Sequence, residues 1–365
     1  MHRAYRGGPL ALLGSSPTRT RVAARAWRTC NLEDVSSRAT VAVLALAVAA
    51  CSPASDAATS HSGAVVHPKR DHGYPMDDLL RMNHVQVKAT HNSYHVETPG
   101  NTLADWHYTH APLDVQLESQ GVRGLELDTR YVAEADRFEV FHIPMLDEQT
   151  TCRAFGDCLA VVKRWSDAHP GHTPILMQIE PKDFPLDDAE AYFEKMQREI
   201  LAAWPRERII APDDVKGDAP TLRDAVTTRG WPTLGEARGT ILFYVDNHDA
   251  WRSSYTRGGT SLADRLMFVD SAEGDPLAGV IIINDPADRA RIDAAARAGF
   301  LVRTRADETG VTEQRAAALA TGGHALSTDF PTMFELPNGT PARCNPVTAP
   351  AGCTPGAVED PAHLR

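Results

Sequence analysis

The sequence predicts an α/β fold, specifically a (β/α)8 barrel of the TIM type that forms a single domain. Apolar runs of strand length alternate with helical patterns along most of the chain, which is the order that a parallel barrel requires. Successive predicted strands also end in polar or charged residues, and barrels of this type carry their reacting groups at the carboxyl ends of the strands. The 365 residues leave room for one barrel of about 250 residues with terminal extensions.

The chain starts with a basic leader. Residues 1–50 hold seven Arg and two acidic residues, and residues 39–50 form an apolar run that is too short to span a membrane and is typical of a signal peptide. Val48-Ala-Ala-Cys51 resembles a bacterial lipobox, which predicts cleavage before Cys51 and lipid attachment to its thiol. An ordinary signal peptide cut nearby is the alternative. We therefore expect an exported protein, either a cell-envelope lipoprotein or a secreted one.

The remaining cysteines support export. Outside the leader and Cys51 there are four, in two pairs that are close in sequence. Disulfides belong to oxidising compartments, so we predict the bonds Cys152–Cys158 and Cys344–Cys353. The spacing lacks the Cys-x-x-Cys form and the histidine partners of zinc sites, which argues against metal binding by these thiols.

The charge balance limits the possible partners. Beyond residue 50 the chain has 30 basic and 46 acidic side chains, a net charge of -16. This acidity disfavours nucleic acid as a partner and provides no general attraction to anionic lipid. A phospholipid would have to be held by local contacts.

Residues 51–72 are rich in small and polar residues without an apolar period, which predicts a flexible tether. Residues 74–82 predict a short helix that closes the barrel floor. The barrel domain is expected over residues 73–335. A Pro-rich tail, residues 336–365, follows and holds the second predicted disulfide.

Eight barrel strands are predicted from runs rich in β-branched and aromatic residues. They are 85–91, 125–131, 138–143, 175–180, 241–246, 280–284, 300–305 and 325–329. The apolar run 267–270 is assigned to a loop. Helices are predicted from apolar residues at helical spacing, over 113–121, 159–169, 187–204, from Leu222 onward, 289–297 and 312–320.

The first strand ends in the most unusual stretch of the chain. Residues 88–94 read Lys-Ala-Thr-His-Asn-Ser-Tyr, with a histidine, an amide and a hydroxyl at successive positions. Where a strand is ending, His91, Asn92 and Ser93 can point around one cavity instead of alternating between faces. We interpret this stretch as one wall of an active site. The following loop, 96–110, carries aromatic residues that either meet a lipid surface or pack against the domain.

The second strand carries two carboxylates of the same parity, Glu126 and Asp128. In a barrel, residues of one parity point the same way, so both are expected to face the mouth. The alternative is a solvated face with an ion pair to Arg130. The neighbouring His91-Asn92 and the later His142 favour the active-site interpretation.

The third and fourth strands add His142 and Glu180, and Lys182 follows Glu180. One asparagine and three carboxylates form an oxygen-rich set that suits a hard cation such as Ca²⁺. Two histidines beside such a cation suit acid and base work on a phosphate ester. Lys182 is in reach of a bound phosphate.

Two arginines near the end of the seventh strand, Arg303 and Arg305, are further candidates for contact with the substrate. A guanidinium group matches phosphate bidentately. The alternative is a structural ion pair with Asp307.

The order His-Asn, Glu-x-Asp, His and Glu resembles the calcium-dependent phosphoinositide-specific phospholipase C family, particularly its single-domain bacterial branch. The resemblance covers about residues 83–331. It implies a Ca²⁺ cofactor held by Asn92, Glu126, Asp128 and Glu180. It also implies three catalytic roles: His91 stabilises the pentacovalent phosphate, His142 acts as acid on the diacylglycerol oxygen, and Glu126 acts as base on the inositol 2-hydroxyl.

The reaction that the resemblance implies is cleavage of membrane phosphatidylinositol to diacylglycerol and inositol 1,2-cyclic phosphate. We also expect the protein to be a monomer. Metal-independent relatives place an arginine where calcium would sit, whereas the carboxylate-rich set here favours a cation. The family's pattern for gripping extra ring phosphates is not recognisable in the second half, so unphosphorylated phosphatidylinositol is expected.

Two alternatives stay open. A glycerophosphodiester phosphodiesterase has a similar barrel but usually carries His-Arg after the first strand, where this chain has His91-Asn92. A non-catalytic surface lipoprotein that binds lipid headgroups is the second. Activity on glycerophosphocholine compared with phosphatidylinositol separates these possibilities.

Overall fold

The computed structural model describes residues 63–183, 189–246, 249–308 and 313–364. The predicted signal peptide and the proposed lipidation site, Cys51, lie outside these residues. In the described part of the chain, no helix has the length and apolar character needed to cross a bilayer.

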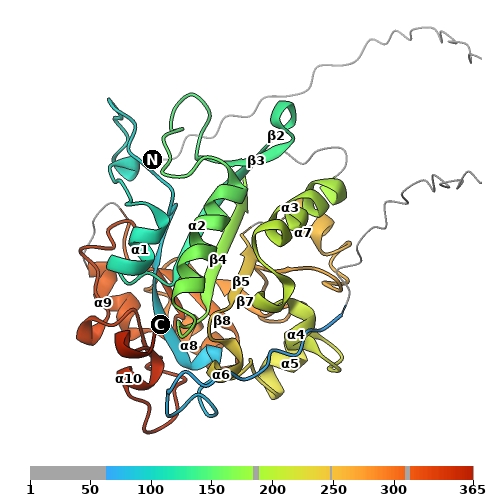
Figure 1. The fold of residues 1–365 in the computed structure, drawn as a ribbon, viewed down its shortest axis with the longest axis vertical. Helices are drawn as coiled ribbons and strands as arrows, with labels where there is room; N and C mark the ends of the chain where they lie inside the picture. The colour runs from blue at the N-terminus through green and yellow to red at the C-terminus, as the bar shows by residue number, and fades with distance from the viewer. Residues whose placement is uncertain (1–62, 184–188, 247–248, 309–312, 365) are drawn as a thin grey trace, which may run out of the picture. The chain divides into compact units, whose positions relative to one another are not determined.

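The described residues form a nearly closed parallel barrel surrounded by helices (Figure 1). Its eight strands run in the spatial order β6-β5-β4-β2-β1-β9-β8-β7. They are β1 (Val85–Thr90), β2 (Gly124–Val132), β4 (Ile175–Pro181), β5 (Ile241–Val245), β6 (Met267–Val269), β7 (Val280–Ile282), β8 (Leu301–Arg305) and β9 (Ala325–Thr328). The seam between β6 and β7 is held by a single bridge from Asp270 to Val280. There the Asp270 carboxylate also accepts a hydrogen bond from Ile282 N at 2.8 Å. The predicted (β/α)8 class is confirmed.

One predicted barrel strand was wrong. Residues 138–143 do not enter the barrel, because β3 (Arg137–Val140) pairs antiparallel with the outer half of β2, with Thr129 opposite Val140. Only a short connection, residues 133–136, separates β2 from β3, and parallel neighbours need a crossover of a dozen or more residues. The missing barrel strand is β6, which lies in the run that we assigned to a loop.

The helices agree with most of the predicted ranges. They are α1 (Leu113–Ser119), α2 (Phe155–Ala168), α3 (Ala189–Ala203), α4 (Pro212–Lys216), α5 (Leu222–Thr228), α6 (Leu234–Ala237), α7 (Asp249–Tyr255), α8 (Arg289–Arg297), α9 (Glu313–Ala320) and α10 (Pro355–Val358). The predicted helix over residues 74–82 was wrong: this segment forms turns followed by a 3₁₀ turn, Met82–His84. Its Asp77 pairs instead with the buried Arg238 at 2.7 Å.

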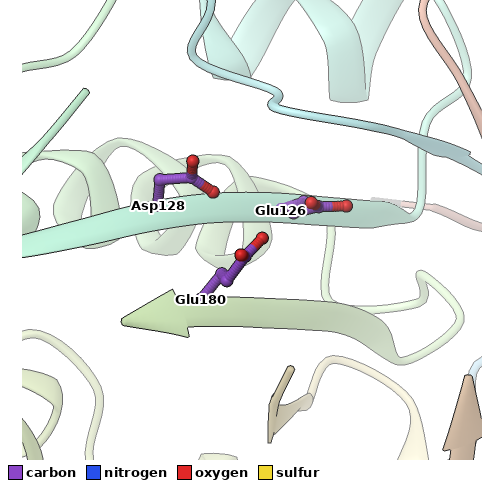
Figure 2. Close-up of side chains that lie close together, drawn as sticks. All are labelled: Glu126, Asp128 and Glu180. Atoms are coloured by element: carbon purple, nitrogen blue, oxygen red, sulfur yellow. The ribbon is translucent and has the colours of Figure 1, made fainter. Parts of the chain in front are cut away.

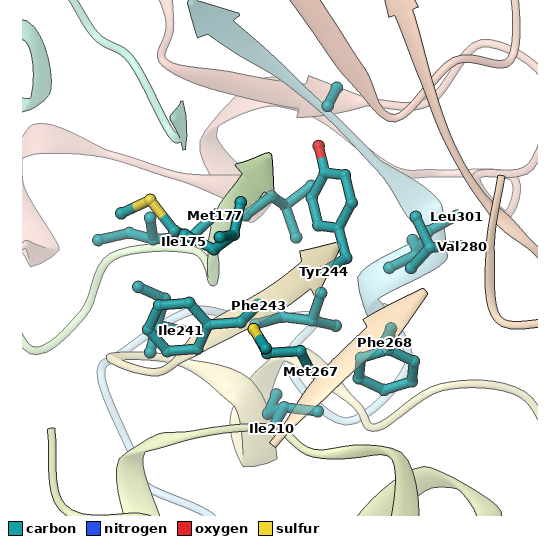
Figure 3. Packing of buried hydrophobic residues seen from close by; sticks show 14 of the residues in the cluster. Ile175, Met177, Ile210, Ile241, Phe243, Tyr244, Met267, Phe268, Val280 and Leu301 are labelled. Atoms are coloured by element: carbon teal, nitrogen blue, oxygen red, sulfur yellow. The ribbon is translucent and has the colours of Figure 1, made fainter. Parts of the chain in front are cut away.

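The core lies between the barrel strands and the surrounding helices. Figure 3 shows neighbours on β5, Phe243 and Tyr244, pointing in opposite directions, as adjacent residues of a strand do. Phe243 and Met267 pack in the buried apolar cluster. This packing fixes the strands and therefore the side chains at their carboxyl ends.

The C-terminal residues complete the barrel floor. Strand β10 (Ala342–Cys344) pairs antiparallel with the start of β1, with Val85 opposite Cys344. Beyond it, the buried carboxylate of Glu359 contacts Arg123 at 2.5 Å and accepts a hydrogen bond from Thr173 N at 2.9 Å. The tail is thus an integral part of the domain.

Both predicted disulfides, Cys152–Cys158 and Cys344–Cys353, are formed. They are typical of a protein that works outside the cytoplasm. The described part of the predicted tether, residues 63–72, is anchored to the domain, because Val65 N donates to Asp214 at 2.6 Å and His67 lies 3.2 Å from the same carboxylate.

Candidate active site

Three carboxylates meet at the carboxyl ends of two neighbouring strands. Glu126 and Asp128 come from β2 and Glu180 from β4, and the register places Asp128 opposite Glu180. Figure 2 shows Glu180 reaching from β4 toward the two β2 side chains. One oxygen of each carboxylate lies within 4.8 Å of the others. We call these three residues the acidic triad.

Asn92 is fixed beside the same strand. It follows β1 with φ of 43°, a left-handed conformation that asparagine tolerates better than most residues. The next residue, Ser93, donates its N–H to the Glu126 carbonyl at 2.9 Å, and its hydroxyl accepts from Glu126 N at 2.8 Å. Gly124 allows this approach, because a Cβ there would lie 2.5 Å from the Ala89 side chain.

The donor set fits a hard cation. Asn92 Oδ1 and Asp128 Oδ1 are buried and accept no well-formed hydrogen bond from any residue that the structure describes, and Asp128 Oδ2 faces the Lys182 ammonium at 3.2 Å without a well-formed hydrogen bond. Buried polar atoms without partners are rare and costly. Oxygen atoms of amides and carboxylates are the ligands that Ca²⁺ prefers. Asn92 and the acidic triad therefore suit a calcium ion chemically.

Two basic side chains contact the acidic triad. Lys182 Nζ lies 2.5 Å from Glu180 and 3.2 Å from Asp128. Arg303 Nη2 lies 2.7 Å from Glu126, and its guanidinium also donates to Asn284 and Ser327. Two of the three predicted substrate-binding residues are thus engaged with the acidic triad.

The third, Arg305, lies close by. Its Nη1 is 3.2 Å from Glu308, whereas its buried Nε has no hydrogen-bond partner among the described residues. Neither Arg303 nor Arg305 forms the ion pair with Asp307 that we considered, because Asp307 pairs with Arg315 at 2.7 Å.

The carboxylates of the acidic triad differ in electrostatic environment. Burial opposes the charge of Glu126, but the Arg303 guanidinium outweighs it, so the pKa of Glu126 is lowered and this carboxyl stays ionised. Burial raises the pKa of Asp128 well above its usual range, and Glu180 and Glu126 add to this against Lys182. Burial also raises the pKa of Glu180. The acidic triad thus holds more negative charge than the two basic groups stabilise.

His91 stands between two carboxylates. Its Nδ1 lies 2.8 Å from Asp329, and its Nε2 lies 3.9 Å from Glu126. The Tyr108 hydroxyl is 3.5 Å from Nδ1, and His110 Nε2 donates to the His91 carbonyl at 2.8 Å. Burial lowers the pKa of His91 well below its usual value, although Glu126 opposes this. In the neutral ring, Nδ1 donates to Asp329 and Nε2 faces the acidic triad.

His142 returns toward the barrel mouth on the hairpin formed by β2 and β3. Arg130 holds its backbone by donating to the His142 carbonyl at 2.6 Å. Its Nδ1 lies 2.9 Å from the buried carboxylate of Asp147, and the Trp106 ring stands edge-on at 5.2 Å. Burial lowers the pKa of His142, while the hydrogen bond to Asp147 opposes this.

Asp147 holds a second histidine. His95 Nε2 lies 2.9 Å from Asp147, and its Nδ1 lies 2.9 Å from the Tyr108 carbonyl. Both ring nitrogens of His95 thus lie at hydrogen-bond distance from an oxygen acceptor. The buried His95 ring therefore fixes the carboxylate on which His142 rests.

Sequence reasoning missed the two aspartates that hold the histidines. Asp329 ends the last predicted strand, which was a usable signal, but Asp147 lies in a loop with nothing to mark it. It also missed Asp246 at the end of β5. Its carboxylate accepts from Gln178 Nε2 at 2.7 Å, and burial raises its pKa to about 7.

Comparisons with known proteins agree with this geometry. A family model described as "Phosphoinositide phospholipase C, Ca2+-dependent" matches residues 80–138 and 132–346. A calcium-dependent phosphoinositol-specific phospholipase C from Pseudomonas sp., apo form, is 19% identical; the match covers 74% of this chain and 97% of that chain, with a TM-score of 0.56. A Ca²⁺-dependent phosphatidylinositol-specific phospholipase C from Streptomyces antibioticus is 20% identical over 69% and 96% of the two chains, with a TM-score of 0.52. At these identities the two structures show a shared barrel fold. The comparison with curated proteins gives no significant match.

Proposed function

The chain belongs to the calcium-dependent phosphoinositide phospholipase C family, a family of phosphodiesterase enzymes, and from this premise we propose that it cleaves phosphatidylinositol to diacylglycerol and inositol 1,2-cyclic phosphate. The observation that carries the proposal is the meeting of the acidic triad with two aspartate-held histidines at one end of the barrel. Active sites of this barrel type lie at that end.

In the proposed reaction the inositol 2-hydroxyl attacks phosphorus, and the bond from phosphorus to the diacylglycerol oxygen breaks. Glu126 takes the proton of the 2-hydroxyl, and the lowered pKa of this carboxyl keeps it in the ionised form that a base requires. His142 gives its Nε2 proton to the departing oxygen, while Asp147 steadies the ring. An attacking group within the substrate has the advantage of proximity, and one general acid contributes roughly 10²–10⁴-fold.

His91 supports the phosphate. Its Nε2 faces the acidic triad, and Asp329 fixes the ring from the other side. The negative charge of a bound phosphate favours the protonated ring, which then donates to a phosphate oxygen. Arg303 and Arg305 line the same mouth and bind the headgroup.

Asn92, Glu126, Asp128 and Glu180 would hold the calcium ion. Bound Ca²⁺ supplies a Lewis acid that lowers the pKa of the 2-hydroxyl and offsets negative charge on the phosphate.

We further propose that the loops around the mouth dock on the membrane. They carry four large exposed apolar side chains, Leu103, Met145, Leu146 and Met333. The most exposed, Met145 at 93%, lies three residues after His142. Exposed apolar groups beside an active site suit partition into a lipid surface. Because the net negative charge of the protein gives no attraction to anionic lipid, these apolar contacts would have to hold it at the membrane. The predicted signal peptide and the disulfides support a place outside the cytoplasm, with the protein either anchored through Cys51 or released, and we propose that it acts as a monomer.

The test is release of water-soluble inositol phosphate from phosphatidylinositol vesicles, with Ca²⁺ and with a chelator. Release only with Ca²⁺, lost in His91→Ala, supports the proposal. Release that the chelator does not affect would refute the metal site. A folded protein that is inactive on phosphatidylinositol but cleaves glycerophosphocholine would be a phosphodiesterase of a different specificity.

A further inference from the structure

Lys182 occupies an unusual place for a residue expected to bind substrate. Its ammonium nitrogen lies 2.5 Å from Glu180 and 3.2 Å from Asp128, two of the three carboxylates drawn in Figure 2. These contacts put a positive charge inside the oxygen set that the proposed function assigns to calcium. A lysine ammonium and a divalent ion cannot both hold these oxygens at contact distance.

The backbone of Lys182 is fixed, although its side chain has room to leave. Its N–H donates to the Thr129 carbonyl at 2.9 Å, and its own carbonyl accepts from Arg130 Nη1 at 3.0 Å. The side chain is 23% exposed and has four flexible methylene groups. The ammonium can therefore swing out of the acidic triad without any movement of β2 or β4.

Arg303 differs in this respect. Its side chain is 4% exposed and is held by Glu126, Asn284 and Ser327 together. These three contacts hold Arg303 beside Glu126. Lys182 is thus the movable one of the two cations that contact the acidic triad in the described residues.

We propose that Lys182 is an exchangeable internal cation: its ammonium group occupies the acidic triad when no divalent ion is bound there, and moves to the substrate phosphate when Ca²⁺ binds. This inference rests on the proposed function. It explains how three carboxylates within 4.8 Å of one another coexist in the metal-free fold, because like charges at this distance repel strongly. It also gives Lys182 a second partner, since a released ammonium lies beside the place where the phosphate must bind.

The experiment is calorimetric titration of CaCl₂ into the purified protein, the variant Lys182→Met and the matched control Lys163→Met. Lys163 makes a comparable ion pair with Asp167, at 2.7 Å, on the outer helix α2. If Lys182 competes with Ca²⁺, its removal tightens Ca²⁺ binding by about tenfold or more, the value of a charge-assisted hydrogen bond that no longer has to be broken. Lys163→Met leaves the affinity unchanged. Circular dichroism confirms that each variant is folded.

Unchanged or weaker Ca²⁺ binding by Lys182→Met would overturn the exchange, even if the wild-type protein binds Ca²⁺ and hydrolyses phosphatidylinositol. Wild-type protein that hydrolyses the lipid without binding Ca²⁺ would overturn both the exchange and the metal site. The second readout is kcat/KM on phosphatidylinositol at saturating Ca²⁺. It falls about tenfold or more in Lys182→Met because the phosphate loses a charge-assisted partner, and an unchanged value would refute the move to the phosphate. Lys182→Arg keeps the charge and restores part of both effects.

Discussion

Replacing Asp147 by asparagine tests whether His142 acts as the acid of the proposed reaction. The substitution keeps the shape of the side chain but removes its charge and one acceptor. Asp147 Oδ2 accepts from both His95 Nε2 and His142 Nδ1, each at 2.9 Å, and Oδ1 accepts from the Thr98 hydroxyl at 3.2 Å. An amide oxygen in the place of Oδ2 keeps both histidine contacts, with the amide N–H₂ group toward the Thr98 hydroxyl, which can accept. The geometry around His142 is therefore kept, and its charged ring loses its counterion.

The magnitude follows from the burial of the pair. The side chains of His142 and Asp147 are 16% and 1% exposed. Opposite charges about 4 Å apart attract by about 4 kcal/mol at an effective dielectric constant of about 20. Because about 1.4 kcal/mol corresponds to tenfold in rate, we expect kcat on phosphatidylinositol to fall about 10³-fold. This lies within the roughly 10²–10⁴-fold that a general acid supplies.

The assay compares two substrates. Phosphatidylinositol has an alkoxide leaving group that needs a proton, whereas a nitrophenyl ester of inositol phosphate has a leaving group that does not. Asp147→Asn should reduce the rate with the nitrophenyl ester by less than about tenfold, because acid catalysis contributes little there. Glu148→Gln removes a charge at the next residue, which is half-buried and keeps an acceptor oxygen for Met145 N. It should leave both rates within about twofold, because substitutions away from buried networks have small effects. An equal loss on both substrates would refute the role of Asp147 in acid catalysis and leave it a purely structural one.

The same variant should move the pH profile in a known direction. Burial lowers the pKa of His142 and Asp147 opposes this, so removing the carboxylate lowers the pKa further. The acid form is then lost at a lower pH, and the alkaline limb of kcat should shift toward acid. A limb that does not move would show that another group controls it.

Three further predictions concern the metal, the floor and the rim. Asp128→Asn should weaken Ca²⁺ binding at least about 100-fold. Loss of a residue that only hydrogen-bonds to a metal ligand already weakens binding by up to about 100-fold, and Asp128 is proposed as a direct ligand. The same substitution should also raise the unfolding midpoint of the metal-free protein, because burial disfavours the charge of the Asp128 carboxyl and raises its pKa, whereas an amide is neutral; calorimetry with and without Ca²⁺ measures both effects. Glu359→Gln should lower the unfolding midpoint by about 10 °C, because breaking the buried pair with Arg123 costs about 3–5 kcal/mol, and the kcat of the folded enzyme at 25 °C should be unchanged. Met145→Asp should weaken vesicle binding about tenfold or more, since one buried apolar side chain contributes about 1.5–3 kcal/mol. The control Leu79→Asp changes an exposed leucine at the barrel floor and should leave vesicle binding unchanged. Sedimentation with vesicles measures both variants, and equal effects would refute docking through the mouth.

The sequence predicted the positions of the acidic triad because strand parity is a local property. Glu126 and Asp128 share a parity, and parallel neighbours bring their carboxyl ends to one edge. The order of the strands was less accessible. The run that forms β6 is only three residues long in the sheet. The antiparallel pairing of β3 with β2 could be predicted only from the connection between them, which is too short for a parallel crossover.

Single residues that act through tertiary contacts could not be predicted. Asp147 meets His95 from 52 positions away, and Asp329 meets His91 from 238 positions away. Asp329 is marked only by its place at the end of a predicted strand, and nothing in the local pattern distinguishes Asp147 from the many acidic residues on the surface. Lys182 was recognised as a candidate phosphate ligand, but its contact with Glu180 and Asp128 depends on the pairing of β2 with β4.

The pairing of the first barrel strand with the last segments of the chain has a consequence for biogenesis. Strand β1 lies between β2 and β9 and also pairs with β10, so Val85 meets Cys344. Contacts over such sequence separations form late, because a long loop must close before they contribute. A chain that is exported from its N-terminus cannot complete this barrel before the residues around Cys344 have followed. Under the proposed export, the catalytic groups are assembled only after the whole domain has been delivered, so the proposed activity on membrane lipid is absent during transit.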